Sequence, residues 1–574
     1  MLLAAISPLR PQSAGIYATR CRCGLPCRRP VLMLARTFMG FRMTDWWRGA
    51  VVYQIYPRSF QDSDGDGIGD LKGITARLDH VAGLGVDAIW LSPVFRSPMA
   101  DMGYDVSDYC DIDPLFGTLE DFDALVARAH DLGLKVIIDQ VISHSSDQHP
   151  AFVESRKDRS NPKAGWYVWA DPKPDGSPPS NWLSVFGGSA WEWDSRRRQY
   201  YLHNFLTSQP DFNFHNPEVQ DYLLGTMRFW LERGVDGFRL DTVNYYFHDA
   251  KLRDNGPEPR EENIPAVNPY DMQDHEYSKC RPENLQFLER MRELLEEFDA
   301  RTMVGEVGEG PRRALRIMEE YTSGHRLHMA YSFDMLGPKF TPAHFRSRVE
   351  GFITAAPNGW PMWAFSNHDV IRHVSRWADH GPQDAVAKLA AAMLLSFEGS
   401  ICLYQGEELG QTETDIEYHE LTDPPGFRFW PDYKGRDGCR TPMVWDGSDH
   451  GGFTTGKPWL PVKPPQLARN VAAQGAGSVL DCYRSLLAWR KGSALVAGRS
   501  TFFDVKPPLL SFRRDAAEGS VFCAFNLSDK PVSLTVKGLT ALDGPQEGAT
   551  LAGDKLSLAP CGWVWASCDT AARA

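Results

Sequence analysis

Residues 51–93 have the sequence VVYQIYPRSFQDSDGDGIGDLKGITARLDHVAGLGVDAIWLSP, which contains the first unit of a repeating pattern. Two apolar, β-rich runs, at 51–57 and 88–93, enclose a stretch with the spacing of an amphipathic helix. Continuous apolar runs of this length are typical of parallel strands that are covered on both faces. The stretch therefore predicts a strand, a helix and a second, parallel strand.

The same alternation continues for most of the chain. Six further runs follow: KVIIDQV (135–141), GFRLD (237–241), MVGEV (303–307), HMAYSF (328–333), MWAFSNH (362–368) and ICLYQGEE (401–408). Eight strands in alternation with helices predict a closed (β/α)8 TIM barrel of the α/β class, because right-handed crossovers around one sheet close at that number. A doubly wound open sheet is the alternative.

Nearly every run ends in a charged or hydrogen-bonding side chain. These are Asp139, Arg239, Asp241, Glu306, His368, Asp369, Glu407 and Glu408. The carboxyl ends of barrel strands form the active-site face. Buried carboxylates cost too much free energy to serve packing alone. The pattern therefore predicts an active site at this end of the barrel.

Long segments without helical periodicity interrupt the alternation. Residues 142–212 are rich in Trp, Pro, Gly and Asn, and residues 411–465 form a second insertion of similar composition. After a last helix at 479–491, alternating strands separated by Gly and Pro continue to the end. The predicted organisation is a catalytic barrel of residues 44–141 and 213–495, an inserted subdomain of residues 142–212 after the third strand, and a C-terminal all-β domain of residues 496–574.

The first 43 residues differ from the rest in composition. They contain seven Arg, no Lys and no acidic residue, and they lack the apolar run and small-residue cleavage site of a secretory signal. Met43 begins MTDWWRGAVVYQIYP, which resembles a natural start. Residues 1–43 are therefore predicted to be a disordered or misannotated leader.

Charge and composition exclude several kinds of partner. The net charge of −13 argues against a nucleic-acid partner, which requires a basic face. No stretch approaches the roughly 20 apolar residues that span a bilayer. The 11 cysteines show no CxxC pair, which suits a reducing compartment, so we expect a cytoplasmic location. We expect a monomer or weak dimer.

The strand-end carboxylates suit one kind of chemistry in particular. Cleavage of a glycosidic bond with retention of configuration needs two carboxyl groups about 5–5.5 Å apart. Asp241 follows Arg239 on the same face of its strand, and the Arg is expected to lower the pKa of this Asp and keep it ionised. Burial at a strand end is expected to raise the pKa of Glu306, as a general acid requires. Taken singly, each residue also fits a buried ion pair.

Taken together, the motifs carry a family resemblance. DQVISH (139–144), GFRLDTVN (237–244), VGEV (304–307) and FSNHD (365–369) occur in the order and spacing of the α-amylase family of glycoside hydrolases, with MGYDVSDY (102–109) and QPDFN (209–213) between them. The chain resembles this family over about residues 45–570. QIYPRSFQDSDGDGIGDLKGI (54–74) narrows the resemblance to the α-glucosidase and oligo-1,6-glucosidase branch.

The resemblance implies a role for individual residues. It implies Asp241 as nucleophile, Glu306 as acid/base and Asp369 as the third carboxylate. Asp101 and Tyr104 match residues that hold the non-reducing end of the glucose at subsite −1. Further sugar-binding or pocket-wall positions are implied for His144, Phe186, Phe205, Arg239, His368 and Arg436. Arg436 is expected to pair with the Asp101 region, with Arg440 as its alternative. This clamp implies exo action on a short substrate, a small oligosaccharide or disaccharide.

Thr242, which follows the nucleophile, bears on linkage preference. In similar enzymes Val at this position accompanies α-1,6 activity, whereas Thr accompanies α-1,4 preference. The resemblance therefore implies an exo-acting retaining α-glucosidase with α-1,4 preference and transglucosylation as a second activity. Sucrose isomerase, sucrose hydrolase and trehalose synthase on the same scaffold are alternatives, and an inactive binding or transporter-partner relative is a remote one.

DSDGDGIGD (62–70) has the spacing of a calcium-binding loop. Asp62, Asp64, Asp66 and Asp70 occupy positions 1, 3, 5 and 9, and Ile68 at position 7 offers its backbone carbonyl. Gly73 stands where an EF-hand has Glu, so the loop is not an EF-hand; it resembles the Ca²⁺ loop of this glucosidase branch. We expect structural Ca²⁺, with Mg²⁺ as the alternative ion and no organic cofactor. A solvated acidic turn is the other interpretation.

Overall fold

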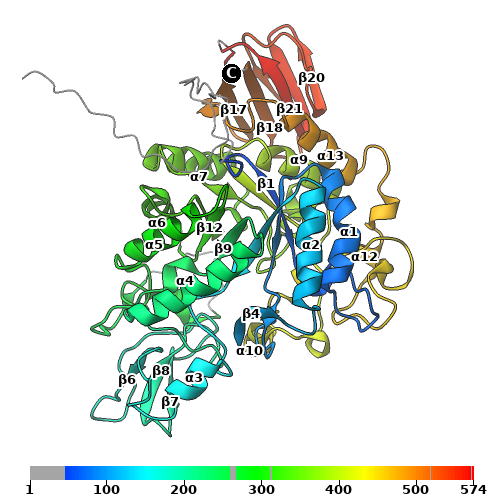
Figure 1. The fold of residues 1–574 in the computed structure, drawn as a ribbon. Helices are drawn as coiled ribbons and strands as arrows, with labels where there is room; N and C mark the ends of the chain where they lie inside the picture. Colours follow the sequence, from blue (N-terminus) through cyan, green and yellow to red (C-terminus); the bar gives the residue numbers. More distant parts are fainter. Residues whose placement is uncertain (1–44, 259–266, 311–312, 518, 571) are drawn as a thin grey trace, which may run out of the picture. The chain divides into compact units, whose positions relative to one another are not determined.

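The computed structural model describes residues 45–258, 267–310, 313–517, 519–570 and 572–574 (Figure 1). The predicted leader, residues 1–43, lies outside the described residues.

Eight parallel strands form the central sheet. They are β1 (Val51–Ile55), β2 (Ala88–Leu91), β5 (Lys135–Gln140), β9 (Gly237–Leu240), β12 (Thr302–Val307), β13 (Met329–Ser332), β14 (Met362–Trp363) and β15 (Ser400–Tyr404). Their order is β13-β12-β9-β5-β2-β1-β15-β14, and every neighbouring pair is parallel. Each of the eight predicted runs coincides with one of these strands, although β12 and β15 begin one residue before the runs at 303–307 and 401–408.

The two ends of this sheet meet. A parallel bridge joins Ala330 of β13 to Pro361, the residue before β14. The sheet therefore closes almost completely, which confirms the predicted (β/α)8 barrel and excludes the open doubly wound sheet.

Helices follow the strands and lie on the outside of the barrel (Figure 1). They are α1 (Leu71–Leu84), α2 (Leu119–Asp131), α4 (Pro217–Glu232), α5 (Asn284–Glu296), α6 (Ala314–Thr322), α7 (Pro342–Ala355), α9 (Gln383–Leu394) and α13 (Val479–Arg490). Local sequence fixes several of their starts, because the Asp70 side chain caps α1 and Thr118 forms a capping box with Asp121 at α2.

The two-residue period of the strands separates an apolar layer from a polar one inside the barrel. Val52, Ile137, Val304 and Met329 belong to one buried cluster. The side chains two residues further along each strand point the same way, and most of them are polar: Gln54, Asp139, Glu306 and Tyr331. The polar layer therefore lies at the carboxyl ends of the strands, where the sequence predicted the active site.

Additional elements interrupt or extend the barrel. The insertion between β5 and β9 contains α3 (Pro150–Ser155) and the antiparallel strands β6 (Trp169–Ala170), β7 (Trp191–Asp194) and β8 (Gln199–Leu202). Short pairs are β3 (Phe95–Arg96) with β4 (Asp108–Ile112), and β10 (Gly256–Pro257) with β11 (Gln273–Asp274). Short helices are α8 (His373–Arg376), α10 (Pro424–Phe429), α11 (Asp437–Arg440) and α12 (Pro464–Leu467).

An antiparallel sheet ends the chain, as predicted for an all-β domain. Its strands are β16 (Arg499–Phe502), β17 (Leu509–Ala516), β18 (Gly519–Asn526), β19 (Val532–Thr535), β20 (Gln546–Ala552) and β21 (Lys555–Cys568). It is anchored to the barrel by hydrogen bonds such as that from the Trp565 indole to the Ala392 carbonyl, at 3.1 Å.

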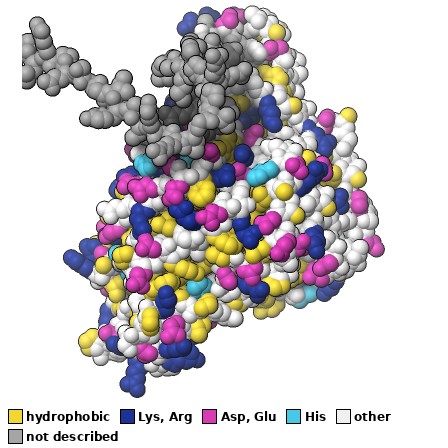
Figure 2. Space-filling view, in the orientation of Figure 1, with side chains coloured by type: hydrophobic (Ala, Val, Ile, Leu, Met, Phe, Trp, Pro, Cys, Tyr) yellow, Lys and Arg dark blue, Asp and Glu magenta, His cyan; other side chains and the backbone are white. Residues whose placement is uncertain are grey.

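Surface and thiol chemistry are unexceptional. Across the described ranges, none of the helices has the length and apolar character needed to cross a bilayer. The eight cysteines in this part of the chain are all unpaired thiols. On the face drawn in Figure 2, Lys and Arg side chains are interspersed with Asp and Glu.

Gly305, in β12 next to Glu306, offers a test of the packing. A Cβ there would lie 2.5 Å from Leu327 Cδ1 and 2.9 Å from Val243 Cγ1. We expect Gly305→Ala to lower stability by about 1–3 kcal/mol through overpacking, measured by denaturant unfolding. Gly83→Ala in α1 is the matched control, because its Cβ meets no atom within 4 Å and should stabilise the helix slightly. Equal stability of Gly305→Ala and the parent would contradict this account of the packing.

Candidate active site

Arg239, on β9, is the side chain around which the strand-end carboxylates gather. Its guanidinium donates to Asp139 at 2.7 and 2.9 Å and to Asp241 at 2.7 Å. It also lies 2.5 Å from a carboxylate oxygen of Glu306. Arg239 is 1% exposed, so its charge is removed from water and is balanced by these three carboxylates.

Thr242 joins the same two carboxylates from the loop side. Its backbone N–H donates to Glu306 at 3.1 Å, and its hydroxyl donates to Asp241 at 3.2 Å. The Ser143 hydroxyl lies 3.0 Å from the Thr242 hydroxyl. Thr242 has φ 40° and ψ 47°, a left-handed conformation that a β-branched residue rarely adopts. Two bridges, through Arg239 and Thr242, therefore hold Asp241 and Glu306 side by side.

Tyr104 and His368 form a hydrogen-bonded pair beside these carboxylates. The Tyr104 hydroxyl donates to Asp139 at 2.9 Å and lies 2.6 Å from Nε2 of His368. The Gln54 amide nitrogen lies 2.7 Å from Nδ1 of His368, so the neutral ring carries its proton on Nε2. Burial lowers the pKa of His368 to about 3, which keeps the ring neutral.

Arg436 binds carboxylates at one end of the site. It lies 2.8 Å from Asp101, 2.7 Å from Asp423 and 3.4 Å from Asp369. Arg440 instead contacts Asp369, at 2.9 Å. Of the two candidate arginines, it is therefore Arg436 that pairs with Asp101.

Aromatic rings form a wall between this end and the carboxylates. The ring centroids of Phe205 and His144 are 5.1 Å apart, and those of Phe205 and Phe186 are 5.7 Å apart. The guanidinium carbon of Arg436 lies 5.0 Å from the centroid of the Phe186 ring. Burial lowers the pKa of His144 to about 4, so this ring is also neutral.

One cavity of about 560 Å³ unites the predicted side chains. Arg239 lies beneath its floor. The predicted residues that line it are Asp101, Tyr104, His144, Phe186, Phe205, Asp241, Thr242, Glu306, His368, Asp369 and Arg436. The structure therefore brings together a set that spans more than 330 positions of sequence.

Sequence patterns did not indicate several other side chains at this cavity. Among them are Tyr245, Asn268, Tyr270, Lys279, Glu309, Phe333, Phe429 and Tyr433, which line it, and Asp423, which pairs with Arg436. Most of these residues lie in loops or short helices without a periodic pattern, such as Phe429 at the end of α10, whereas Phe333 is the last residue of the run HMAYSF (328–333). Gln209 is different, because it belongs to the QPDFN motif; its amide donates to Asp101 at 3.0 Å.

Burial dominates the protonation of the carboxylates. It raises the pKa of Asp241 to about 7, and although Arg239 opposes this shift, neighbouring carboxylates reinforce it. Burial also raises the pKa of Glu306 to about 7, and the charge of Asp241 adds to the shift. The expectation that Arg239 makes the net pKa of Asp241 low was therefore wrong, because removal from water outweighs the ion pair. Both carboxyls of the buried pair therefore keep a proton to higher pH than exposed carboxyls do.

Asp369 behaves in the opposite way. Burial works against its ionisation, but the neighbouring His368, Arg436 and Arg440 outweigh burial and hold its pKa below the ordinary range. Asp369 therefore stays ionised in the range where Asp241 and Glu306 exchange protons.

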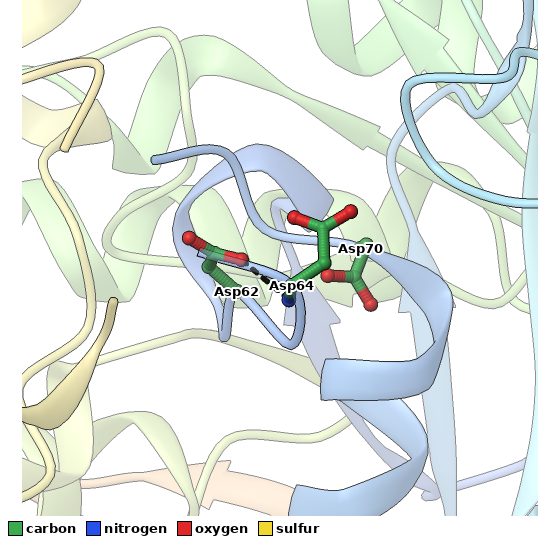
Figure 3. Close-up of side chains that lie close together, drawn as sticks. All are labelled: Asp62, Asp64 and Asp70. Carbon is green, nitrogen blue, oxygen red and sulfur yellow. Dashed lines mark hydrogen bonds between the residues drawn. The ribbon is translucent and has the colours of Figure 1, made fainter. Parts of the chain in front are cut away.

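The acidic loop between β1 and α1 brings three carboxylates together (Figure 3). Oxygens of Asp62, Asp64 and Asp70 lie within 4.8 Å of one another. Asp70 also caps α1 by accepting from the backbone N–H of Gly73 at 2.8 Å. A set of hard oxygen donors of this kind fits Ca²⁺ or Mg²⁺.

Asp66 belongs to the predicted ligand set but not to this group of three. One of its carboxylate oxygens accepts from the backbone N–H of Ile68 at 2.8 Å. Asp66 as a ligand stays a prediction. The carbonyl of Ile68 as a ligand stays a prediction.

Comparisons with known proteins agree with the geometry. Residues 54–498 match the family model described as alpha amylase, catalytic domain. The chain is 60% identical over 512 residues to a probable alpha-glucosidase of Rhizobium meliloti (strain 1021), covering 87% of this chain and 93% of that protein. It is 39% identical over 539 residues to an oligo-1,6-glucosidase of Heyndrickxia coagulans, covering 86% and 94%. The crystal structure of the alpha-glucosyl transfer enzyme XgtA superposes with a TM-score of 0.88 at 53% identity, covering 91% of this chain and 99% of XgtA.

The raised pKa of Asp241 predicts a pH-dependent gain in stability on neutralising it. A buried carboxyl whose folded pKa lies above its unfolded value stabilises the fold below about pH 4, and this contribution is lost as pH rises through about 7. We expect the melting temperature of Asp241→Asn, relative to that of the parent, to be higher at pH 8 than at pH 5 by on the order of 2 °C. Asp504→Asn, whose side chain is 93% exposed, should show no such trend. A constant difference across this range would argue against the predicted burial effect.

The acidic loop predicts a metal-dependent stability. If Asp62, Asp64 and Asp70 hold Ca²⁺, chelation should lower the melting temperature of the parent, because a bound ion at 100 times its Kd stabilises by about 2.7 kcal/mol. Asp64→Ala should melt lower and lose its response to Ca²⁺ while keeping glycosidic activity at temperatures where it is folded. Asp529→Ala, in the C-terminal domain, is the control. A parent that is indifferent to both chelator and Ca²⁺ would leave only a solvated acidic turn.

Proposed function

The chain belongs to the α-amylase family of glycoside hydrolases, in its α-glucosidase and oligo-1,6-glucosidase branch, and we propose that it removes the terminal glucose of short α-glucosides with retention of configuration. One observation carries the proposal: Arg239 and Thr242 each hold both Asp241 and Glu306 at the floor of one cavity. Two carboxyls fixed in this way match the pair that retaining hydrolysis requires.

In the proposed first step, a carboxylate oxygen of Asp241 attacks the anomeric carbon while protonated Glu306 gives its proton to the glycosidic oxygen. The bond to the leaving group breaks as the ester bond to Asp241 forms. In the second step, Glu306 takes a proton from water, whose oxygen attacks the same carbon, and the Asp241 carboxylate is released. Two inversions give net retention.

The protonation of the pair supports this division of labour. Burial raises the pKa values of both groups, so the pair keeps a proton to higher pH than exposed carboxyls would. Placement of that proton on Glu306 leaves Asp241 ionised beside Arg239. As the ester forms, Asp241 loses its charge and Glu306 gains one, and both partners remain on the same guanidinium. The site can therefore exchange charge between the two groups without reorganising.

Exo action is proposed from the clamp at the closed end. Arg436 is held by Asp101, Asp423 and Asp369, and its ion pair with Asp101 lies across the end of the cavity. Asp101 and Arg436 present polar atoms to the terminal hydroxyls of a glucose. A chain that continued beyond this glucose would have to displace a buried ion pair.

Two finer features extend the proposal. The Thr242 hydroxyl is hydrogen-bonded to Ser143 and Asp241. A Val side chain could make neither bond, and this difference supports the proposed α-1,4 preference. Transglucosylation as a second activity is supported by the likeness to an enzyme named for α-glucosyl transfer. We also propose structural Ca²⁺ in the acidic loop and a reducing, cytoplasmic location, which the unpaired thiols favour.

Product analysis on maltose, isomaltose and sucrose tests the proposed function. We expect α-glucose as the first product by NMR, faster cleavage of maltose than of isomaltose, and a loss of at least about 10³-fold in Asp241→Asn. First release of β-glucose would exclude retention. Conversion of sucrose into an isomeric disaccharide would favour the sucrose isomerase alternative, and conversion of maltose into trehalose would favour trehalose synthase.

The same panel on Thr242→Val tests the linkage preference. We expect the isomaltose-to-maltose ratio of kcat/KM to rise by about tenfold, since a hydroxyl-for-methyl change is worth roughly 1–3 kcal/mol. Thr242→Ser keeps the hydroxyl and should retain the parent ratio. An unchanged ratio in Thr242→Val would refute a role for this side chain in linkage choice.

A further inference from the structure

The cavity is also lined by a group of polar side chains that the proposed mechanism does not use. Tyr245, Tyr270, Lys279 and Glu309 all line it. Lys279 is 5% exposed, and the side chain of Glu309 is 7% exposed. A buried ammonium and a buried carboxylate are costly to keep unless they serve a purpose at the cavity.

Lys279 is fully committed to neighbouring groups. Its ammonium lies 3.0 Å from Oε1 of Glu309, and it donates to the carbonyl of Gly308 at 2.8 Å and to the hydroxyl of Tyr245 at 3.2 Å. Two of the three donors of the ammonium are hydrogen-bonded and its charge is paired with Glu309, so it is not free to bind a ligand. Lys279 is therefore a positioning residue, which fixes Glu309.

Glu309 keeps one acceptor available. Its Oε1 forms the ion pair with Lys279 and accepts from the Cys280 thiol at 3.4 Å. Its Oε2 has no hydrogen-bond partner within the described stretches of chain. A carboxylate that lines a cavity with one oxygen unused can accept from a ligand hydroxyl, and such charge-assisted bonds are stronger than neutral ones.

The chain path places this group beyond Glu306. Glu309 follows Glu306 by three residues, and Asn244 ties the intervening Gly308 to the β9 loop through hydrogen bonds of 3.0 and 3.2 Å. In the proposed mechanism Glu306 gives its proton to the leaving group. We therefore assign Glu309, which lines the same cavity three residues later in the chain, to the side where the leaving group departs and an acceptor enters.

We propose that Glu309, held by Lys279, binds vicinal hydroxyls of a neutral sugar on the acceptor side, and so decides whether sugar or water receives the glucosyl group. The inference rests on the proposed retaining mechanism. In the transfer step, Glu306 takes the proton of an acceptor hydroxyl, the acceptor oxygen forms a bond to the anomeric carbon, and the ester bond to Asp241 breaks. The charge of the ammonium is already paired with Glu309, so this group fits a neutral polyol better than a phosphorylated sugar.

Partition of the glucosyl-enzyme measures this directly. p-Nitrophenyl α-glucoside serves as donor, and either methyl β-glucoside or methanol as acceptor. The ratio of transfer product to free glucose is independent of how fast the glucosyl-enzyme forms, because acceptor and water compete for the same intermediate. For Glu309→Gln we expect the ratio with methyl β-glucoside to fall about tenfold, the loss of one charged hydrogen bond. The ratio with methanol, which has no vicinal diol, should change by less than about twofold.

Two further variants keep the test decisive. Glu309→Asp retains the charge opposite Lys279 but withdraws the oxygens by one methylene, so it should show the same selective loss if Glu309→Gln fails to fold. Glu547→Gln is the control. Glu547 lies in the C-terminal domain, where its carboxylate pairs with Lys388 of α9, and its replacement should change neither ratio. Equal falls with both acceptors, or no fall with either, would overturn the role of Glu309. Absence of nitrophenol release from the parent would instead refute the proposed function itself.

Discussion

The buried guanidinium of Arg239 is the group on which the site depends. It contacts Asp139, Asp241 and Glu306, three carboxylates from three neighbouring strands. Without a cation at this point, mutual repulsion and desolvation would force protons onto all three. The barrel supplies the geometry, because β5, β9 and β12 are adjacent and their alternate residues point inward at the same level. The strand register that brings these side chains together therefore also sets the charge balance of the site.

Under this constraint, Asp241 and Glu306 are harder to ionise than exposed carboxyls. One guanidinium cannot compensate three buried carboxylates and the nearby Asp369 completely, so the pKa values of Asp241 and Glu306 rise. The excess negative charge is what allows the pair to keep a proton to higher pH than exposed carboxyls would. A stronger compensation would stabilise the fold but would remove the proton that a general acid needs.

Two buried cations at the cavity are held in the same way, by groups of the protein itself. Arg436 is held by Asp101, Asp423 and Asp369. Lys279 is held by Glu309, the Tyr245 hydroxyl and a backbone carbonyl. Such a cation orients the acceptor groups that face the ligand. The partners of the two cations differ. Arg436 and Asp101 form a closed ion pair, whereas Glu309 beside Lys279 keeps one carboxylate oxygen unpaired among the described residues. The two groups therefore favour one orientation of a bound substrate.

Local sequence was enough to determine the barrel, its family and the carboxylates at the strand ends. The alternation of apolar strands and helices is a short-range signal, and Asp241 and Glu306 lie inside motifs of a few residues. Only the tertiary structure decided which arginine pairs with Asp101, that oxygens of Asp62, Asp64 and Asp70 lie close together, and that burial outweighs Arg239 in setting the pKa of Asp241. The same holds for Asp423, Lys279 and Glu309, which come from loops without periodicity. Contacts between distant loops, and the exclusion of water that they cause, depend on the folded chain as a whole, so no window of sequence encodes them.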